Sequence, residues 1–343
     1  MRKLLNTLFV LTESTYLSLE NSNIVLNLED KKKKYIPLLG IEEIFCFTYA
    51  GASPALIGEC AERCIGFNMF SPTGKFLARA TGRSYGNVLL RKEQYRWSDD
   101  EASRCKVARL MIAAKIYNSK WQIERTIRDH GLRVDVEALK EASEKLGEYV
   151  RQCPQIEDID ELRGIEGNAA SIYFGIFDQM ILQQKDTFTF SGRNRRPPLD
   201  PVNAMLSFGY RLLESDCAAA LEGVGLDSYV GFMHTDRSGR ESLALDLMEE
   251  FRAIMVDRLV LSMINLKKIS SKDFDFFENG TVYLNDDGRK LFIQEWQSRK
   301  REEIKHPYLK EKIQWGLIPY SQALLLARFI RGDLDDYPAF FWK

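Results

Sequence analysis

The feature that most constrains the fold is a change in hydrophobic pattern near residue 90. Before it, short runs rich in Val, Ile, Thr, Phe and Tyr alternate with turn residues, as in TLFVLT, NIVLNLE and EEIFCFTY. Such runs are typical of short β-strands. After it, apolar residues recur three and four positions apart, which predicts amphipathic helices. We therefore predict an α+β fold with a small β-rich domain over residues 1–92 and a larger helical domain over residues 98–343.

Two capping boxes indicate where helices of the second domain begin. Ser98 is followed three residues later by Glu101, and Ser238 is followed at the same spacing by Glu241. In a capping box the two side chains accept hydrogen bonds from backbone amides at the start of the helix. The first box places the domain boundary at residues 90–97. The predicted helices cover residues 99–118, 119–130, 135–152 and 240–266.

Composition and charge exclude several classes of protein. With 343 residues, of which 45% are hydrophobic, the chain can bury a substantial core. Its formal net charge of −1 provides no overall attraction to nucleic acid, so an anionic partner would need local basic clusters. No segment approaches the roughly 18 apolar residues of a membrane span. The six cysteines form no CxxC pair, and we expect free thiols in a reducing cytoplasm.

A histidine followed by closely spaced carboxylates is the first candidate site. His234, one of three histidines, lies in the loop before the helix predicted over residues 240–266. Asp246, Glu249 and Glu250 lie at positions i, i+3 and i+4 of that helix, where like charges repel by roughly 0.2–0.5 kcal/mol per pair. A divalent cation would relieve that repulsion, and imidazole and carboxylate groups both ligate metals. The alternative is a solvated polar stripe on the helix.

Glu166 is the candidate for a third ligand. It lies in GIEGNAASIYFGIF, where Gly164, Gly167 and Gly175 interrupt a helical pattern, although each glycine costs roughly 1 kcal/mol relative to alanine. We interpret these glycines as positions of close backbone approach. An unpaired carboxylate in such an apolar setting would be costly. Glu166 therefore either binds a cation or projects into solvent.

An arginine-rich loop over residues 186–198 is the candidate for phosphate contacts. Its basic residues are Arg193, Arg195 and Arg196. Asp200 then caps a helix with Pro201 in its first turn. Asn203, Ser207 and Tyr210 share one face of that helix. Arginine suits phosphate recognition because its guanidinium donates paired hydrogen bonds, and a solvated loop is the alternative.

The chain ends in an aromatic segment, DYPAFFWK. Four bulky side chains within eight residues form an apolar patch of the kind that is normally covered. We expect the tail to dock on its own chain or on a partner.

Taken in order, GIEGNAAS, RRPPLDPVNAMLSFGYRLL and GFMHTDRSGRESLALDLMEEFR resemble the CRISPR-associated adaptation endonuclease family, the integrases that insert new spacers into CRISPR arrays. The resemblance extends over essentially the whole chain. It implies that Glu166, His234 and Glu249 bind Mg²⁺ or Mn²⁺ and that Asp246 is a neighbouring catalytic acid. It also implies that Arg237 contacts DNA near the metal.

The arginine loop and the helix after it gain a role from the same resemblance. Asn203, Ser207 and Tyr210 match the family's helix beside the metal site, and we count Asn203 among the expected DNA contacts. Arg193, Arg195 and Arg196 are expected to lie near the metal and to contact phosphates.

The resemblance also implies partners. Members of the family are homodimers through the β-rich domain, and two such dimers enclose a dimer of a small companion CRISPR-associated protein. The resulting heterohexamer holds a short double-stranded DNA, the protospacer, for insertion at a CRISPR repeat. The wording RRPPLDP and the ending YPAFFWK are most similar to the type I-C subtype.

The implied reaction is a transesterification. A 3′-hydroxyl of the incoming DNA attacks a phosphodiester at the repeat boundary, and a bound metal ion can polarise the phosphate and stabilise the developing charge. Two alternatives use the same residues. One is a metal-dependent nuclease that cuts branched or single-stranded DNA without integration, and the other is a non-catalytic scaffold that holds DNA.

Overall fold

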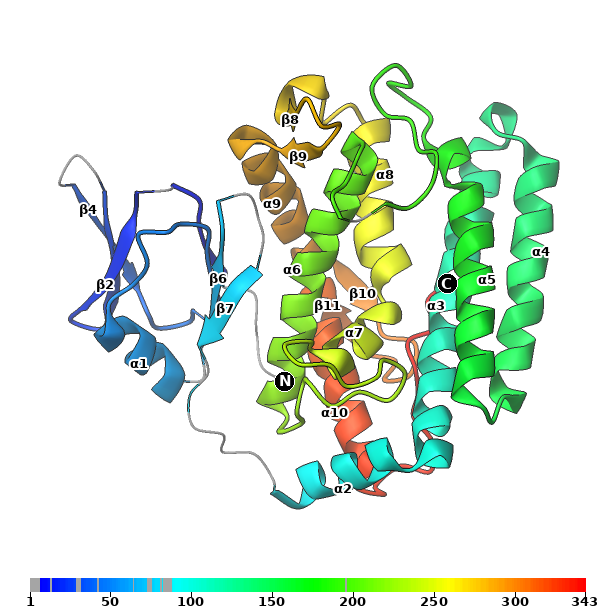
Figure 1. The fold of residues 1–343 in the computed structure, drawn as a ribbon, viewed down its shortest axis with the longest axis horizontal. Helices are drawn as coiled ribbons and strands as arrows, with labels where there is room; N and C mark the ends of the chain where they lie inside the picture. The colour runs from blue at the N-terminus through cyan, green and yellow to red at the C-terminus, as the bar shows by residue number, and fades with distance from the viewer. Residues whose placement is uncertain are drawn as a thin grey trace. The chain divides into compact units, whose positions relative to one another are not determined.

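The computed structural model describes residues 7–343 except 13, 29–31, 42, 64, 73–75, 81, 83–87 and 195. The chain divides into two compact units, Met1–Tyr85 and Gly86–Lys343. Strands dominate the first unit and helices the second (Figure 1), so the predicted α+β fold is confirmed. The boundary predicted at residues 90–97 falls inside a helix, α2 (Val88–Asp99). Because α2 covers Val88–Asp99 and belongs to the second unit, the boundary between the units lies before residue 90.

The first unit contains two small sheets and one helix. Its four-stranded sheet has the order β1-β5-β6-β7, with β1 and β6 parallel to β5 and with β7 antiparallel to β6. These strands are β1 (Thr7–Val10), β5 (Glu43–Cys46), β6 (Gly66–Phe70) and β7 (Phe76–Ala80). The antiparallel three-stranded sheet consists of β2 (Tyr16–Glu20), β3 (Asn23–Asn27) and β4 (Lys33–Pro37).

The core of the first unit forms where the strands turn their apolar residues inward. Leu17, Ile24, Ile44 and Phe67 are fully buried in one cluster. Helix α1 (Pro54–Glu62) begins at Ser53, whose side chain accepts a hydrogen bond from the backbone amide of Leu56. The cap satisfies an amide that the first turn leaves open and allows Leu56 to pack into this core.

The second unit is a helical assembly with two short hairpins. Its longer helices besides α2 are α3 (Glu101–His130), α4 (Val136–Gln152), α5 (Ile159–Gly175), α6 (Pro201–Gly223), α7 (Ser242–Glu249), α8 (Arg258–Asn265), α9 (Asp286–Arg301) and α10 (Ile318–Ile330). The hairpins pair β8 (Phe274–Phe276) with β9 (Val282–Leu284) and β10 (Glu303–Lys305) with β11 (Lys312–Gln314). Short 3₁₀ turns cover Gly131–Arg133, Cys153–Gln155, Phe177–Met180, Ser271–Asp273 and Trp315–Leu317.

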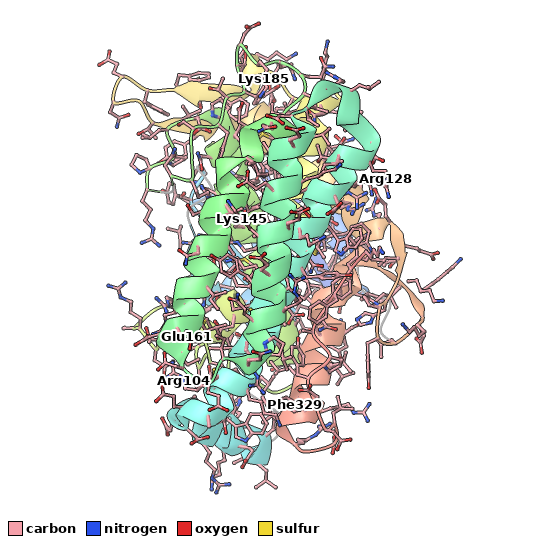
Figure 2. All side chains as sticks on the ribbon, turned by 90° about the vertical axis from the view of Figure 1, so that its right-hand side faces the viewer. Arg104, Arg128, Lys145, Glu161, Lys185 and Phe329 are labelled. Carbon is pink, nitrogen blue, oxygen red and sulfur yellow. The ribbon has the colours of Figure 1, made fainter. Side chains whose placement is uncertain are left out.

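Helices α3, α4 and α5 lie side by side, as Figure 2 shows. The predicted break between residues 118 and 119 is absent, because α3 is continuous from Glu101 to His130. The polar side chains there are satisfied by the fold. The Asn118 amide donates to the backbone oxygens of Glu250 (2.8 Å) and Phe340 (2.7 Å). A local sequence pattern cannot reveal such distant partners.

Neither predicted capping box forms. The Ser98 hydroxyl donates to the Tyr95 carbonyl in the last turn of α2, and Asp100 caps α3 instead by accepting from the amide of Ser103. Glu241 precedes α7 without a side-chain capping bond. Asp100 lies two residues after Ser98 and directly precedes α3, and an aspartate caps a helix as well as a serine does.

The continuous helix predicted over residues 240–266 is also wrong. Helix α7 ends at Glu249, a π-helix covers Arg252–Asp257, and α8 follows directly. A π-helical turn contains an additional residue, which a pattern of period 3.6 does not reveal, and such turns are frequent at functional sites.

The aromatic tail docks on its own unit, around the buried carboxylate of Glu250. Glu250 accepts hydrogen bonds from the Tyr337 hydroxyl (2.5 Å), the Phe340 amide (2.6 Å) and the Gln322 side chain (3.1 Å). Burial raises the pKa of Glu250 to about 7, although these hydrogen bonds oppose the increase. The tail thus closes over the residue that follows Glu249.

Two further findings concern the whole described chain. The cysteines that the structure describes, Cys46, Cys60, Cys105, Cys153 and Cys217, are buried and free, and Cys64 lies outside the described residues. In the same part of the chain, every helix is too short or too polar to cross a membrane.

Candidate metal centre

His234 is held in place by Asp246. The Asp246 side chain is buried, and its Oδ2 accepts hydrogen bonds from the backbone amides of Phe232 (2.6 Å) and Met233 (2.9 Å). Its Oδ1 accepts from the His234 amide (3.0 Å) and lies 2.6 Å from His234 Nδ1. A carboxylate in this position would fix the orientation of a metal-ligating imidazole and leave Nε2 available as the ligand atom.

Gly231 makes this loop possible. A Cβ atom at this position would lie 2.8 Å from Asp246 Oδ2 and 2.8 Å from Ser242 Cβ. Only glycine avoids that collision, so the chain can bring the two following amides onto the carboxylate.

The electrostatic environment of His234 favours its protonated form. Burial opposes protonation, but the hydrogen bond and the negative charge of Asp246 outweigh it and raise the pKa of His234 above its usual 6.5. Asp246, which the sequence suggested as a catalytic acid, contacts the Nδ1 side of the imidazole and raises the pKa of His234.

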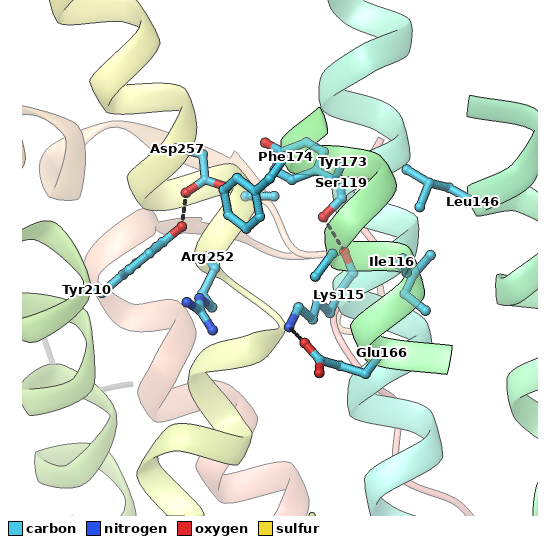
Figure 3. Close-up of a pocket in the computed structure, with 13 residues that line it drawn as sticks. Lys115, Ile116, Ser119, Leu146, Glu166, Tyr173, Phe174, Tyr210, Arg252 and Asp257 are labelled. Carbon is cyan, nitrogen blue, oxygen red and sulfur yellow. Dashed lines mark hydrogen bonds and ion pairs between the residues drawn. The ribbon is translucent and has the colours of Figure 1, made fainter. Parts of the chain in front are cut away.

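Glu166 of α5 and Glu249 of α7 meet at one ammonium group. Lys115 Nζ forms an ion pair with Glu166 Oε1 and lies 2.8 Å from Glu249 Oε2. Figure 3 shows the Lys115 side chain reaching Glu166. Arg252 Nη1 lies 2.7 Å from Glu249 Oε1. The two expected ligands therefore converge, although they come from different parts of the chain.

The repulsion expected among Asp246, Glu249 and Glu250 is absent. Burial disfavours the charge of Glu249, but Arg252 and Lys115 outweigh it and hold the pKa of Glu249 at about 2. The Asp246 side chain contacts the His234 imidazole, and the Glu250 carboxylate accepts a hydrogen bond from Tyr337 of the C-terminal tail. All three acids are buried, so the solvated-stripe interpretation is also wrong.

The donor set fits a hard divalent cation. Glu166 and Glu249 meet at Lys115, and His234 is close enough to Glu249 to lower its pKa electrostatically. Carboxylates suit Mg²⁺ and Mn²⁺, and an imidazole shifts the preference towards Mn²⁺. As the side chains stand, however, no three His, Cys, Asp or Glu residues among those described are close enough together to ligate one ion. Lys115 lies between the two glutamates.

A partly open pocket is lined by Lys115 and Glu166. Its far wall is polar, because the Tyr210 hydroxyl donates to Asp257 (Figure 3). The Arg252 guanidinium lies 4.2 Å from the centre of the Tyr210 ring. Burial raises the pKa of Asp257 to about 6, against the effect of the Tyr210 hydrogen bond. Arg252 thus connects the Glu249 carboxylate to the wall of the pocket.

Lys115 and Arg252 were not anticipated from the sequence. Lys115 interrupts the apolar run MIAAKIY, and a lysine on a buried helix face requires a partner. Arg252 follows Glu249 by three residues, a spacing at which opposite charges pair on a helix. Both signals were present, but neither identifies the partner from the other helix.

The arginine loop is attached to α6 by its own side chains. Arg193 donates to the side chains of Asn203 and Ser207. Asn203 is fully buried, and its amide group donates to the Gly192 carbonyl (2.8 Å) and to Asp200 (2.6 Å). The expected contact of Asn203 with DNA is therefore not available, since its side chain is used to hold the loop.

The other basic positions expected to contact DNA are Arg195, Arg196 and Arg237. Arg196 and Arg237 are exposed, whereas Arg195 lies outside the described residues.

The close approach expected at Gly164, Gly167 and Gly175 is wrong, because a Cβ atom at any of the three would meet nothing within 4 Å.

The fold and the centre define an α+β protein whose helical unit brings two glutamates and an oriented histidine together. The family described as "CRISPR associated protein Cas1" matches residues 8–298. The chain is 46% identical over 343 residues to the CRISPR-associated endonuclease Cas1 1 of Chlorobaculum tepidum, and the match covers 100% of both chains. The chain belongs to the Cas1 family of CRISPR-associated proteins, as its motifs suggested.

Solved structures share the fold. A casposase bound to an integration product has a TM-score of 0.83 at 23% identity, with 98% of this chain and 94% of that chain covered. A chain of a Cas6-RT-Cas1–Cas2 complex has a TM-score of 0.82 at 22% identity, with 100% of this chain and 36% of that chain covered.

Proposed function

We propose that the protein is a metal-dependent DNA endonuclease and integrase of CRISPR adaptation. It would insert short duplex DNA into a CRISPR array by attack of a 3′-hydroxyl on a phosphodiester. The observation that carries the proposal is the convergence of Glu166 and Glu249 on one cationic group, beside a histidine that Asp246 orients. The relative from Chlorobaculum tepidum is named an endonuclease, and the casposase of similar fold was solved with an integration product.

Glu166, His234 and Glu249 are the proposed ligands of Mg²⁺ or Mn²⁺, and the bound ion would polarise the phosphate and stabilise charge on the reacting oxygens. The chain's own residues prepare this centre. Because the pKa of Glu249 is about 2, its carboxylate is ionised at neutral pH. Asp246 fixes the imidazole through Nδ1. Exposed Arg196 and Arg237 are proposed to contact DNA phosphates, as is Arg195.

The proposed partners are a second copy of the chain and a small companion protein. The β-rich unit would form the homodimer, because the edges of its small sheets need a partner. One structure of similar fold is part of a complex that contains Cas2, which supports a companion of that kind in a heterohexamer. We assign the protein to type I-C on the segments RRPPLDP and YPAFFWK and place its reaction in the cytoplasm, where a CRISPR array is accessible.

The test combines purified protein and its companion with a short duplex that ends in 3′-hydroxyls and a plasmid that carries the CRISPR array. The expected result is duplex covalently joined to the plasmid at a repeat boundary, with Mn²⁺ but not with EDTA. Glu166→Ala, His234→Ala and Glu249→Ala should each abolish joining, while the exposed control Glu144→Ala should retain it. Metal-dependent cutting without joining would indicate the nuclease alternative. DNA binding without any metal-dependent product would indicate the scaffold.

A further inference from the structure

Lys115 contacts both proposed carboxylate ligands, and the proposed reaction does not explain its presence. Its side chain is 13% exposed, and its ammonium lies between Glu166 and Glu249. Helix α3 presents it there from a buried, largely apolar face. A buried lysine must be paired, and both partners of Lys115 are proposed metal ligands.

The ammonium and a metal ion would compete for the same oxygens. The Lys115 ammonium forms an ion pair with Glu249 Oε2 at 2.8 Å and so occupies space beside the oxygen that a metal ion would need. Mg²⁺ and Mn²⁺ approach carboxylate oxygens much more closely, at about 2.1 Å for Mg²⁺. Two cations on one carboxylate oxygen would repel each other strongly at that separation. Metal binding therefore requires that Lys115 move.

The pocket beside Glu166 offers space for the Lys115 side chain to move into. Lys115 also lines this pocket, and its four-carbon stem allows the charged group to turn away from the carboxylates. DNA brings phosphate groups to this centre in the proposed reaction, and lysine binds phosphate readily as a point charge. A phosphate beside the centre would draw the ammonium away from Glu166 and Glu249.

We propose that Lys115 is an internal competitor for the metal and couples metal binding to DNA binding. It holds the two glutamates together until a DNA phosphate attracts its ammonium, and the freed carboxylates then bind the cation. Because coupling between two ligands is reciprocal, bound metal should in turn strengthen DNA binding. The inference rests on the proposed function, since it concerns the same metal and the same DNA.

The test measures Mn²⁺ affinity by electron paramagnetic resonance of the free ion, with and without a short duplex. The variants are Lys115→Met and, as a matched control on the same helix, Lys120→Met, whose lysine pairs with Glu124 (3.0 Å). Lys115→Gln provides a second variant that retains a hydrogen-bond donor without the charge. Glu249→Ala identifies the Mn²⁺ bound at this centre.

Without DNA, Lys115→Met should bind Mn²⁺ about tenfold more tightly than the parent, which corresponds to about 1.4 kcal/mol. The duplex should tighten Mn²⁺ binding to the parent and to Lys120→Met, but should change it less than about twofold in Lys115→Met. Mn²⁺ should also raise the melting temperature of Lys115→Met more than that of the parent, because a ligand stabilises the state that binds it.

Equal or weaker Mn²⁺ binding by both Lys115 variants would overturn the inference, as would an undiminished effect of DNA in them. These results would leave the proposed function intact if the parent binds Mn²⁺ through Glu249. If neither the parent nor any variant binds Mn²⁺, with or without duplex, the proposed metal centre fails and the inference fails with it.

Discussion

Replacement of Glu249 by alanine should destabilise the protein even in EDTA. Glu249 is 5% exposed and pairs with Lys115 and Arg252. The alanine variant leaves Arg252 buried without this carboxylate, whereas Lys115 retains Glu166. The sequence alone suggests the opposite result, since removal of one of three crowded acids would relieve repulsion.

The pKa of Glu249 sets the magnitude. The pKa falls from 4.5 to about 2, and each pKa unit corresponds to about 1.4 kcal/mol, so the ionised carboxylate stabilises the fold by about 3 kcal/mol. Loss of one partner from a buried ion pair costs a similar amount. Because the pKa in the folded state is lowered, this stabilisation is fully present above pH 4.5 and is lost as the pH falls towards 2.

The assay is urea unfolding followed by tryptophan fluorescence in EDTA. All five tryptophans lie in the second unit, so the signal reports the unit that contains Glu249. Glu249→Ala should be about 3 kcal/mol less stable than the parent at pH 7, and the difference should shrink below pH 4.5. Glu144→Ala, an exposed control on α4, should be unchanged. A Glu249→Ala protein as stable as the parent at pH 7 would refute the reasoning.

Three further predictions test other parts of the structure. Asp246→Asn should weaken Mn²⁺ binding by about 10–100-fold, because the orientation of His234 is lost, and electron paramagnetic resonance of free Mn²⁺ would measure it; unchanged affinity would show that Asp246 does not position the ligand. Tyr337→Phe should lower the free energy of unfolding by about 1 kcal/mol, since the buried Glu250 loses a hydrogen bond, and urea unfolding without any loss would separate the tail from Glu250. Arg196→Ala and Arg237→Ala should each reduce the slope of log affinity against log salt by about one for duplex DNA, as measured by fluorescence anisotropy, and an unchanged slope for both would leave these arginines as solvated surface.

The sequence by itself determined the fold class and the candidate ligands. Strand-like alternation before residue 90 and helical spacing after it depend on which residues are neighbours along the chain, so they identify β and α regions without tertiary information. Glu166, His234 and Glu249 came from the resemblance of three sequence motifs to the adaptation endonucleases. The sequence did not decide the helix ends, because Ser98 and Asp100 are both good caps and the structure has Asp100 as the cap.

Only the tertiary structure decided how those residues act. Asp246 and Glu249 are three residues apart, yet one orients His234 and the other meets Lys115 and Arg252. Glu250 accepts a hydrogen bond from Tyr337 of the C-terminal tail. The sequence places the three acids on one helix face, where repulsion is expected, but the charges that oppose it come from α3 and from a π-helical turn. Electrostatic energy depends on distance in space, and Lys115 is 51 residues from Glu166 along the chain but in direct contact with it.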